Sequence, residues 1–349
     1  MKKILLLVLL YLVPLSVQAS IVVMDMDSNR VLYGINEKEE KLIASTTKIM
    51  TAIVVIQNTD INEVITIDQS VLRSFGSGIY IEVGEEISIK DLLYGLMLRS
   101  GNDAAIALAE HIGGSEEGFA KLMNEMAESL GMYQTHFINA SGLENDKGEG
   151  NTSTATDMAI LMSYAMKNSI FKDITSTKHY MAKTNYKTYD WYNKNKLLIN
   201  YKYTTGGKTG YTEKAYRTLV TSASKDGKNL VIVTLDQRDD FAIHESLYEE
   251  YFSRYKLVKV LDKNKFMKEE KGYIENDINM LLTDKELKNI KIEVQKIDDS
   301  TNRLGYAIIS LDDEVYFKEN VYKITQDKEI KSKTSLWDRI KMFFKNIFN

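Results

Sequence analysis

The spacing of apolar residues changes several times along the chain, and each change predicts a different element. Two strand-like runs, 21–24 and 31–33, flank the polar stretch 25–30, which predicts a β-hairpin. From residue 45 to 56 the apolar period becomes helical, so Ser45 lies at the entry of an apolar helix. Further helices are expected after the capping-box pattern Ser88–Asp91 and over 104–109, 115–130 and 156–167.

Strand patterns return near residue 208. The β-rich runs are 208–212, 218–223 and 230–235, with a turn at Asp226–Gly227, and 245–252 is expected to form a closing helix. Strands thus stand at both ends of this region, with helices between them. We therefore expect a mixed α/β fold whose terminal strands share one sheet, with an inserted helical lobe and a cleft between the lobes.

Beyond residue 256 the pattern changes to short alternating strands. Ile290, Ile292 and Val294 alternate with charged residues, which is typical of β-structure. The 349 residues are enough for one large core and a smaller domain. The predicted organisation is a catalytic domain over 20–256 followed by a small, mainly β domain over 257–327.

The first 19 residues have the pattern of a secretory signal. Lys2 and Lys3 precede the apolar run 4–13, and the smallish residues Val17 and Ala19 place cleavage after Ala19. The alternative interpretation is an uncleaved N-terminal membrane anchor. Cleavage predicts a protein that is exported across the cytoplasmic membrane.

The last segment, 328–349, carries an apolar stripe opposed by basic residues. The stripe consists of Leu336, Trp337, Ile340, Phe343, Phe344 and Ile347, and the basic residues opposite it are Arg339, Lys341 and Lys345. The segment is too short and too charged to span a bilayer, but it suits a helix lying in the membrane interface near anionic lipid. The alternative is a terminal helix docked on the protein itself.

Composition narrows the possible chemistry. The sequence contains no cysteine, so neither a disulfide nor a thiol nucleophile is available. Its four histidines lack metal-ligand spacing, which disfavours a zinc hydrolase, and no cofactor is expected. The formal net charge is −4 although the last segment is basic, so the rest of the chain is more acidic. Nucleic acid is therefore disfavoured as a partner.

The motif Ser45-Thr46-Thr47-Lys48 places a hydroxyl and an amine on one helical face. A serine hydroxyl is a poor nucleophile until a base removes its proton. Lys48, one turn after Ser45, can be that base only when neutral, which requires a lowered pKa. A second cation nearby would lower it, and Lys208 is the candidate. By itself the motif is more often a helix N-cap with a solvated lysine.

A second motif, Ser100-Gly101-Asn102, lies between two predicted helices. A loop at this place can face the cleft, where Ser100 would relay a proton between the lysines and a leaving amine. The amide of Asn102 can bind a substrate carbonyl. Taken alone, this tripeptide is more often a turn.

The third motif, Lys208-Thr209-Gly210, lies on a predicted strand. Lys208 and the Thr209 hydroxyl can hold a terminal carboxylate, and Gly210 allows a substrate to approach the backbone closely. A tetrahedral intermediate also needs an oxyanion hole. Its expected donors are the backbone N–H groups of Ser45 and Tyr211.

The three motifs stand in the order found in penicillin-interacting serine enzymes. Over about 21–252 the chain resembles the D-alanyl-D-alanine carboxypeptidases, the low-molecular-mass penicillin-binding proteins of the serine peptidase class. The stretches that carry the resemblance are 44–52, 92–96, 100–105, 130–137, 141–143, 193–198 and 207–212. The resemblance implies the transpeptidase fold that serine β-lactamases and penicillin-binding proteins share.

The resemblance also implies a reaction and a setting. Ser45 would attack the carbonyl between the two terminal D-alanines of a peptidoglycan stem pentapeptide and release D-alanine. Water would then hydrolyse the acyl-enzyme, and β-lactams would acylate the same serine. Such an enzyme would act in cell-wall biogenesis, at the outer face of the cytoplasmic membrane.

Some positions depart from the family pattern. Tyr216 stands where members usually have glycine, and 152–155 lacks the tyrosine often found before its Ser-Thr-Ala. An arginine binds the substrate carboxylate in some members. Arg238 is the candidate here, although a plain surface charge is the competing interpretation.

Two other functions stay open at this point. A class A-like β-lactamase would need a glutamate over the acyl-enzyme, and Glu144 matches no clear pattern for that role. A wall-binding scaffold with a decayed catalytic centre is the second alternative, against which the intact motifs argue.

Overall fold

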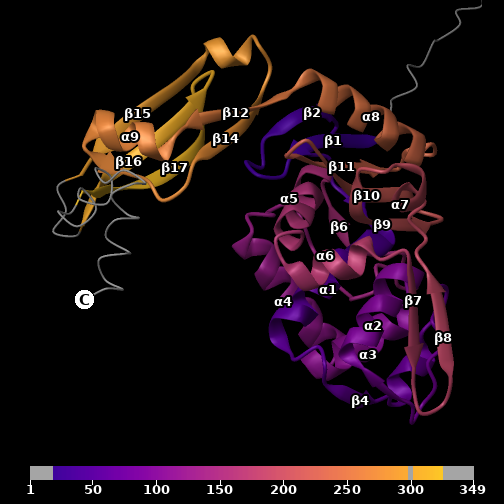
Figure 1. The fold of residues 1–349 in the computed structure, drawn as a ribbon. Coiled ribbons are helices and arrows are strands. Elements are labelled where there is room, and N and C mark those ends of the chain that lie inside the picture. Colours follow the sequence, from indigo (N-terminus) through magenta and orange to yellow (C-terminus); the bar gives the residue numbers. More distant parts are fainter. Residues whose placement is uncertain (1–18, 298–301, 325–349) are drawn as a thin grey trace, which may run out of the picture.

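The computed structural model describes residues 19–297 and 302–324 (Figure 1). The expected signal up to residue 18 and the expected tail, 328–349, lie outside these residues. Among the described helices, none is both long and apolar enough to cross a bilayer.

A five-stranded antiparallel sheet lies at the centre of the larger domain, in the order β2-β1-β11-β10-β9. Its strands are β1 (Ser20–Asp25), β2 (Val31–Ile35), β9 (Thr204–Thr212), β10 (Tyr216–Lys225) and β11 (Lys228–Leu235). The expected hairpin forms, because β1 pairs with β2. On its other side β1 pairs with β11, with Ser20 opposite Leu235. The prediction that the first and last strands share one sheet is therefore confirmed.

Helices cover both faces of this sheet and also build a separate lobe (Figure 1). On one face lie α5 (Ala155–Ala165) and α6 (Ser169–Ser176), and on the other lies α8 (Asp240–Arg254). The lobe contains α1 (Lys48–Asn58), α2 (Ile89–Tyr94), α3 (Asn102–Gly113) and α4 (Glu116–Ser129). Three helix starts are fixed by caps, because the side chains of Ser88, Ser115 and Thr154 each accept a hydrogen bond from the N–H three residues later.

Two apolar clusters pack against the central sheet from opposite sides. Strand β1 contributes to both, since Val22 and Met24 face one cluster and Val23 faces the other. The first cluster continues into the helical lobe, and the second lies beneath α8 around Tyr248 and Phe252. Because both faces are covered, β1 is buried along its whole length.

Several short elements were not expected from the sequence. The hairpin of β7 (His179–Lys183) and β8 (Thr188–Tyr192) is the largest of them, and it buries Tyr189 and Trp191 on alternate positions. The others are β3 (Lys41–Leu42), η1 (Ala44–Thr47), β4 (Val64–Thr66), η2 (Gln69–Arg73), β5 (Glu86–Ser88), the π-helix η3 (Gly95–Arg99), β6 (Thr152–Ser153) and α7 (Leu197–Asn200).

The C-terminal region is mainly β and has a core of its own around Met280, Leu282 and Ile309. Its elements are β12 (Lys256–Leu261), α9 (Lys263–Glu270), β13 (Gly272–Tyr273), β14 (Ile278–Leu282), η4 (Glu286–Lys288), β15 (Ile290–Lys296), β16 (Arg303–Leu311) and β17 (Glu314–Lys323). The buried Arg30 of the larger domain reaches Glu286 at 3.1 Å and so connects the two parts.

Candidate active site

Ser45 lies in η1, at the junction with α1, and Lys48 is the first residue of α1. The Nζ atom of Lys48 lies 3.1 Å from Ser45 Oγ, 2.7 Å from Asn102 Oδ1 and 2.5 Å from the carbonyl oxygen of Ser141. The Lys48 side chain is fully buried. A neutral amine in this position can accept the proton of the Ser45 hydroxyl.

The environment of Lys48 favours the neutral amine. Its pKa is lowered from 10.5 to about 7, mainly by burial and also by the charge of Lys194, while Asp103 opposes the shift. The repulsion between the charges of Lys48 and Lys208, which the sequence led us to expect, lowers the pKa of Lys208. On Lys48 itself two causes lower the pKa. Desolvation comes first, and the neighbouring cation that adds to it is Lys194.

The Ser100–Asn102 loop connects η3 to α3 and lies beside Lys48. Ser100 adopts a left-handed backbone conformation with φ 64°, and its Oγ accepts a hydrogen bond from Lys208 Nζ at 3.0 Å. The side chain of Asn102 uses Oδ1 for Lys48 and donates Nδ2 to the carbonyl of Phe75 at 2.7 Å. The carboxylate of Asp103 accepts the N–H groups of residues 79 and 80, which holds the neighbouring loop over the site.

Strand β9 brings Lys208 from the opposite side. Its Nζ atom is buried and also donates to the carbonyl oxygen of Thr209 at 2.7 Å. Burial, together with the charges of Lys48 and Lys194, holds the pKa of Lys208 well below 10.5. An approaching carboxylate would raise this pKa again, because an opposite charge stabilises the ammonium form.

Gly210 lies directly against the backbone of the nucleophile. A Cβ atom at this position would lie 2.3 Å from Thr218 Oγ1 and 3.0 Å from the backbone nitrogen of Ser45. Only glycine therefore lets β9 approach η1 this closely. The close approach also brings Tyr211, the next residue, beside the nucleophile.

A cleft of about 360 Å³ opens above these groups. It is lined by Ser45, Ser77, Ser100, Lys194, Lys196, Thr209, Gly210, Tyr211, Arg217 and Phe241. Lys48 and Lys208 lie buried behind this lining. Asn102 lines a neighbouring groove of about 410 Å³.

Five of the lining residues were not selected from the sequence. Of these, Lys194 and Lys196 lie in the stretch 193–198, which carried the family resemblance without suggesting a role. Arg217 stands on β10 opposite Tyr211, and its guanidinium donates to the buried carboxylate of Asp240 at 3.1 and 2.7 Å. Arg238, the candidate from the sequence, is exposed and is not among the lining residues.

Glu144 lies in the neighbouring groove, where its carboxylate accepts a hydrogen bond from Thr212 Oγ1 at 2.5 Å. It therefore holds the end of β9. Within the described ranges, no group of three His, Cys, Asp or Glu side chains is arranged to hold a metal ion.

The fold and these contacts define a class of enzyme. An activated serine at a helix start, supported by lysines from a helix and from a strand, is the arrangement of a serine peptidase that works through an acyl-enzyme. Residues 14–239 match the D-alanyl-D-alanine carboxypeptidase family, and the chain belongs to this family.

Similar proteins agree with this assignment. The chain is 33% identical to the D-alanyl-D-alanine carboxypeptidase DacF of Bacillus subtilis over 85% of its own length and 82% of the relative. The crystal structure of a D-alanyl-D-alanine carboxypeptidase from Mycobacterium tuberculosis superposes with a TM-score of 0.65 at 31% identity, covering 67% of this chain and 90% of the other. A point mutant of the Streptomyces K15 DD-transpeptidase gives 0.63 at 32% identity, with coverages of 67% and 97%.

Proposed function

We propose that this protein removes the terminal D-alanine from peptidoglycan stem pentapeptides through an acyl-enzyme on Ser45, and that β-lactams acylate the same residue. The observation that carries the proposal is the buried Lys48 amine, 3.1 Å from Ser45 Oγ, with a pKa of about 7. At neutral pH a large fraction of this amine is unprotonated, so a base for acylation is present.

In the proposed acylation, Ser45 Oγ bonds to the carbonyl carbon between the two D-alanines and gives its proton to Lys48. The N–H groups of Ser45 and Tyr211 stabilise the oxyanion. When the C–N bond breaks, the amine of the leaving D-alanine takes a proton through Ser100, which lies between it and the lysines. Water then attacks the ester and releases the shortened peptide.

The terminal carboxylate of the substrate would bind at the strand side of the cleft. Thr209 and Arg217 line the cleft there, Lys208 lies buried directly behind this lining, and Lys194 adds positive charge. Arg217 is held in place because Asp240 engages its Nε and one terminal nitrogen, which leaves its other N–H groups for a ligand. Asn102 would contact the peptide from the neighbouring groove that it lines.

Labelling with a fluorescent penicillin tests the proposal directly. Wild-type protein is expected to become covalently labelled, and Ser45→Ala is expected to lose the label while keeping its thermal unfolding transition. Label that persists in Ser45→Ala would contradict the assignment. The lifetime of the label separates a carboxypeptidase, which should hold it for minutes or longer, from a β-lactamase, which should turn it over rapidly.

Arg217→Gln is expected to raise KM for a D-Ala-D-Ala peptide by roughly 10-fold, with a smaller change in kcat, because one charge-assisted hydrogen bond is worth about 1.5–3 kcal/mol. The matched control is Arg238→Gln, which should leave KM unchanged because Arg238 is exposed outside the cleft. Steady-state kinetics measure both. A rise in KM for the Arg238 variant alone would reverse the assignment.

The proposed setting rests on the two ends of the sequence. The signal pattern at 1–19 would export the protein, and the basic amphipathic segment 328–349 would anchor it to the outer face of the cytoplasmic membrane. The catalytic domain would extend over 20–256 and the small β domain over 257–327.

Deletion of 336–349 is expected to release the enzyme from membranes without loss of peptidase activity. The removed segment holds the whole apolar stripe, whereas the described active site lies wholly upstream of it. Fractionation of cells that express the full-length and shortened chains measures the effect. If the shortened chain stays on the membrane fraction, the anchor lies elsewhere.

A further inference from the structure

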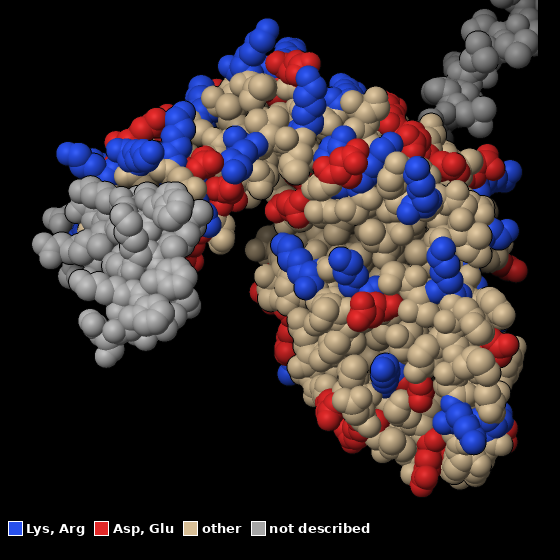
Figure 2. Space-filling view, viewed as in Figure 1, with Lys and Arg blue, Asp and Glu red and all other residues tan. Residues whose placement is uncertain are grey.

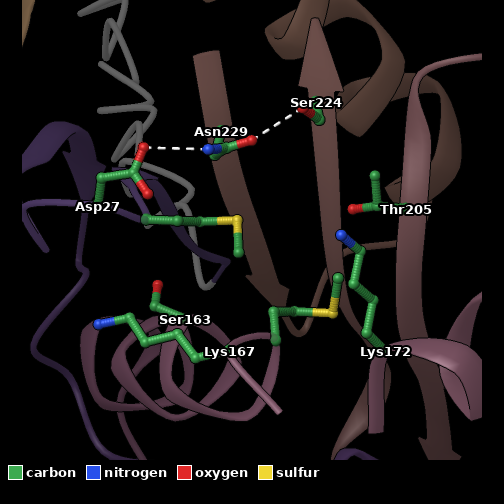
Figure 3. A pocket seen from close by; sticks show the side chains of 9 residues that line it. Asp27, Ser163, Lys167, Lys172, Thr205, Ser224 and Asn229 are labelled. Atoms are coloured by element: carbon green, nitrogen blue, oxygen red, sulfur yellow. Dashed lines mark hydrogen bonds between the residues drawn. The ribbon is translucent and has the colours of Figure 1, made fainter. Parts of the chain in front are cut away.

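A second polar cavity lies at the end of the central sheet, away from the catalytic cleft, and we call it the sheet-end cavity (Figure 3). Its volume is about 150 Å³, and it shares no lining residue with the cleft. The lining residues are Met26, Asp27, Ser163, Met166, Lys167, Lys172, Thr205, Ser224 and Asn229. Strands β9, β10 and β11 form one wall, and α5 and α6 form the other.

Two ammonium groups of this cavity lack a protein partner. Lys172 extends from α6 toward the wall that carries Thr205 and Ser224, and Lys167 lies at the opposite rim near the end of α5 (Figure 3). Both lysines are exposed, and within the described residues neither Nζ atom makes an ion pair or a hydrogen bond, whereas the exposed Lys256 and Lys291 each pair with a carboxylate. Figure 2 shows Lys and Arg side chains on this side of the molecule, at the level of α5 and α6.

The floor of the cavity offers a buried hydroxyl with spare hydrogen-bonding capacity. Ser163 is 1% exposed, and the partner of its Oγ is the sulfur of Met24 at 4.0 Å, a weak acceptor. In Figure 3 this hydroxyl points up toward the cavity. Because a thioether sulfur is a weak acceptor, a ligand oxygen here would give this hydroxyl a stronger partner.

The remaining polar groups are already fixed. Asn229 donates Nδ2 to Asp27 at 3.0 Å and accepts from Ser224 Oγ at 2.8 Å. The single carboxylate of the cavity is thus engaged by an amide, while the two lysines are not engaged. Two ammonium groups against one carboxylate leave a local excess of one positive charge, which favours an anion.

We propose that the sheet-end cavity binds a small oxyanion of the phosphate class, either free or as the head of a phosphate monoester or diester. Its volume of about 150 Å³ is several times the space that one water molecule needs, which leaves room for one tetrahedral oxyanion. Lys172 and Lys167 supply charge, and Ser163 supplies a hydroxyl. None of these residues takes part in the peptidase chemistry.

Helix α6 connects the sheet-end cavity with β9, the strand that carries Lys208. Thr175, one turn after Lys172, accepts a hydrogen bond from the N–H of Gly207 at 2.9 Å and donates to its carbonyl oxygen at 3.1 Å. Gly207 directly precedes the catalytic-strand residue Lys208. Binding at Lys172 would therefore act on the helix that holds this part of β9.

The proposal is tested with the full-length chain by equilibrium dialysis of radiolabelled inorganic phosphate at constant ionic strength. Saturable binding of one phosphate per chain is expected, and Lys167→Gln/Lys172→Gln should weaken it at least 10-fold. The matched control is Lys178→Gln, an exposed lysine on the segment after α6, which should bind as wild type does. Penicillin labelling should be kept in all variants, which shows that they are folded.

Competition then identifies the source of the anion. Displacement by glycerol phosphate but not by phosphatidylglycerol vesicles indicates a soluble or polymer-borne phosphate, and displacement by the vesicles indicates a lipid headgroup. Three results would overturn the proposal: no saturable binding, equal binding by the double variant, or equal displacement by chloride. The last would show charge screening only.

Discussion

Replacing Lys48 by methionine should slow acylation by a β-lactam roughly 10²–10⁴-fold, the usual contribution of a positioned general base. In the wild type, the acylation rate should fall about tenfold per pH unit below a midpoint near 7, because only the neutral amine can take the proton of Ser45 and its pKa is about 7. Stopped-flow acylation across pH 5–9 measures both effects. The residual acylation rate of Lys48→Met should not show this fall below pH 7.

The control for this prediction is Lys194→Met. The charge of Lys194 contributes to the low pKa of Lys48, so removing it should move the midpoint to higher pH. The base itself remains, so at high pH and saturating β-lactam the maximal acylation rate should stay near the wild-type value. A midpoint that stays in place, or a Lys48 variant that keeps the pH step, would contradict the assignment.

The same pKa shift affects stability, with a defined sign. Between about 7 and 10.5 the unfolded chain keeps a proton on Lys48 that the folded chain has released. The unfolded state thus binds more protons, and the contribution of Lys48 makes the free energy of unfolding rise with pH in this window. Denaturant titrations at several pH values give the free energy of unfolding. Between pH 7 and 10.5 it should rise more steeply with pH in the wild type than in Lys48→Met.

Replacing Gly210 by alanine should lower the acylation rate roughly 10²–10³-fold, the cost of losing one oxyanion donor. The new Cβ would lie 2.3 Å from Thr218 Oγ1 and 3.0 Å from the backbone nitrogen of Ser45. Either β9 and η1 must therefore separate, or the N–H group of Ser45 must turn away from the oxyanion. The core clusters on both faces of the sheet are untouched, so the thermal unfolding transition should persist. Penicillin acylation kinetics measure the loss.

A second variant distinguishes the two steric causes. In Gly210→Ala/Thr218→Ala the shorter contact is removed, while the contact at the backbone nitrogen of Ser45 remains. Thr218→Ala alone is the reference, because Thr218 Oγ1 also donates to the carbonyl oxygen of Ile43 at 3.1 Å. Recovery of the rate to this reference would assign the loss to strand displacement, and no recovery would assign it to the obstructed N–H of Ser45. A Gly210→Ala protein that acylates as fast as the wild type would contradict the close approach itself.

Much of the larger domain could be predicted because its signals are local. The helix starts at Ser88, Ser115 and Thr154 are encoded by capping side chains, and β1 and β11 by runs of apolar residues. The hairpin of β7 and β8 was missed although Tyr189 and Trp191 alternate with polar residues, because no strong turn signal marks the connection between its two strands.

The sequence by itself determined which chemical groups are present, in which order, and that Ser45 and Lys48 share one helical turn. Only the tertiary structure decided what surrounds them. Ser100 and Lys208 are separated by 108 residues and meet because β9 packs against η1, which no local pattern encodes. The low pKa of Lys48 comes mainly from desolvation, a collective effect of many packed residues, and the choice of Arg217 over Arg238 comes from the register of β10 beside β9.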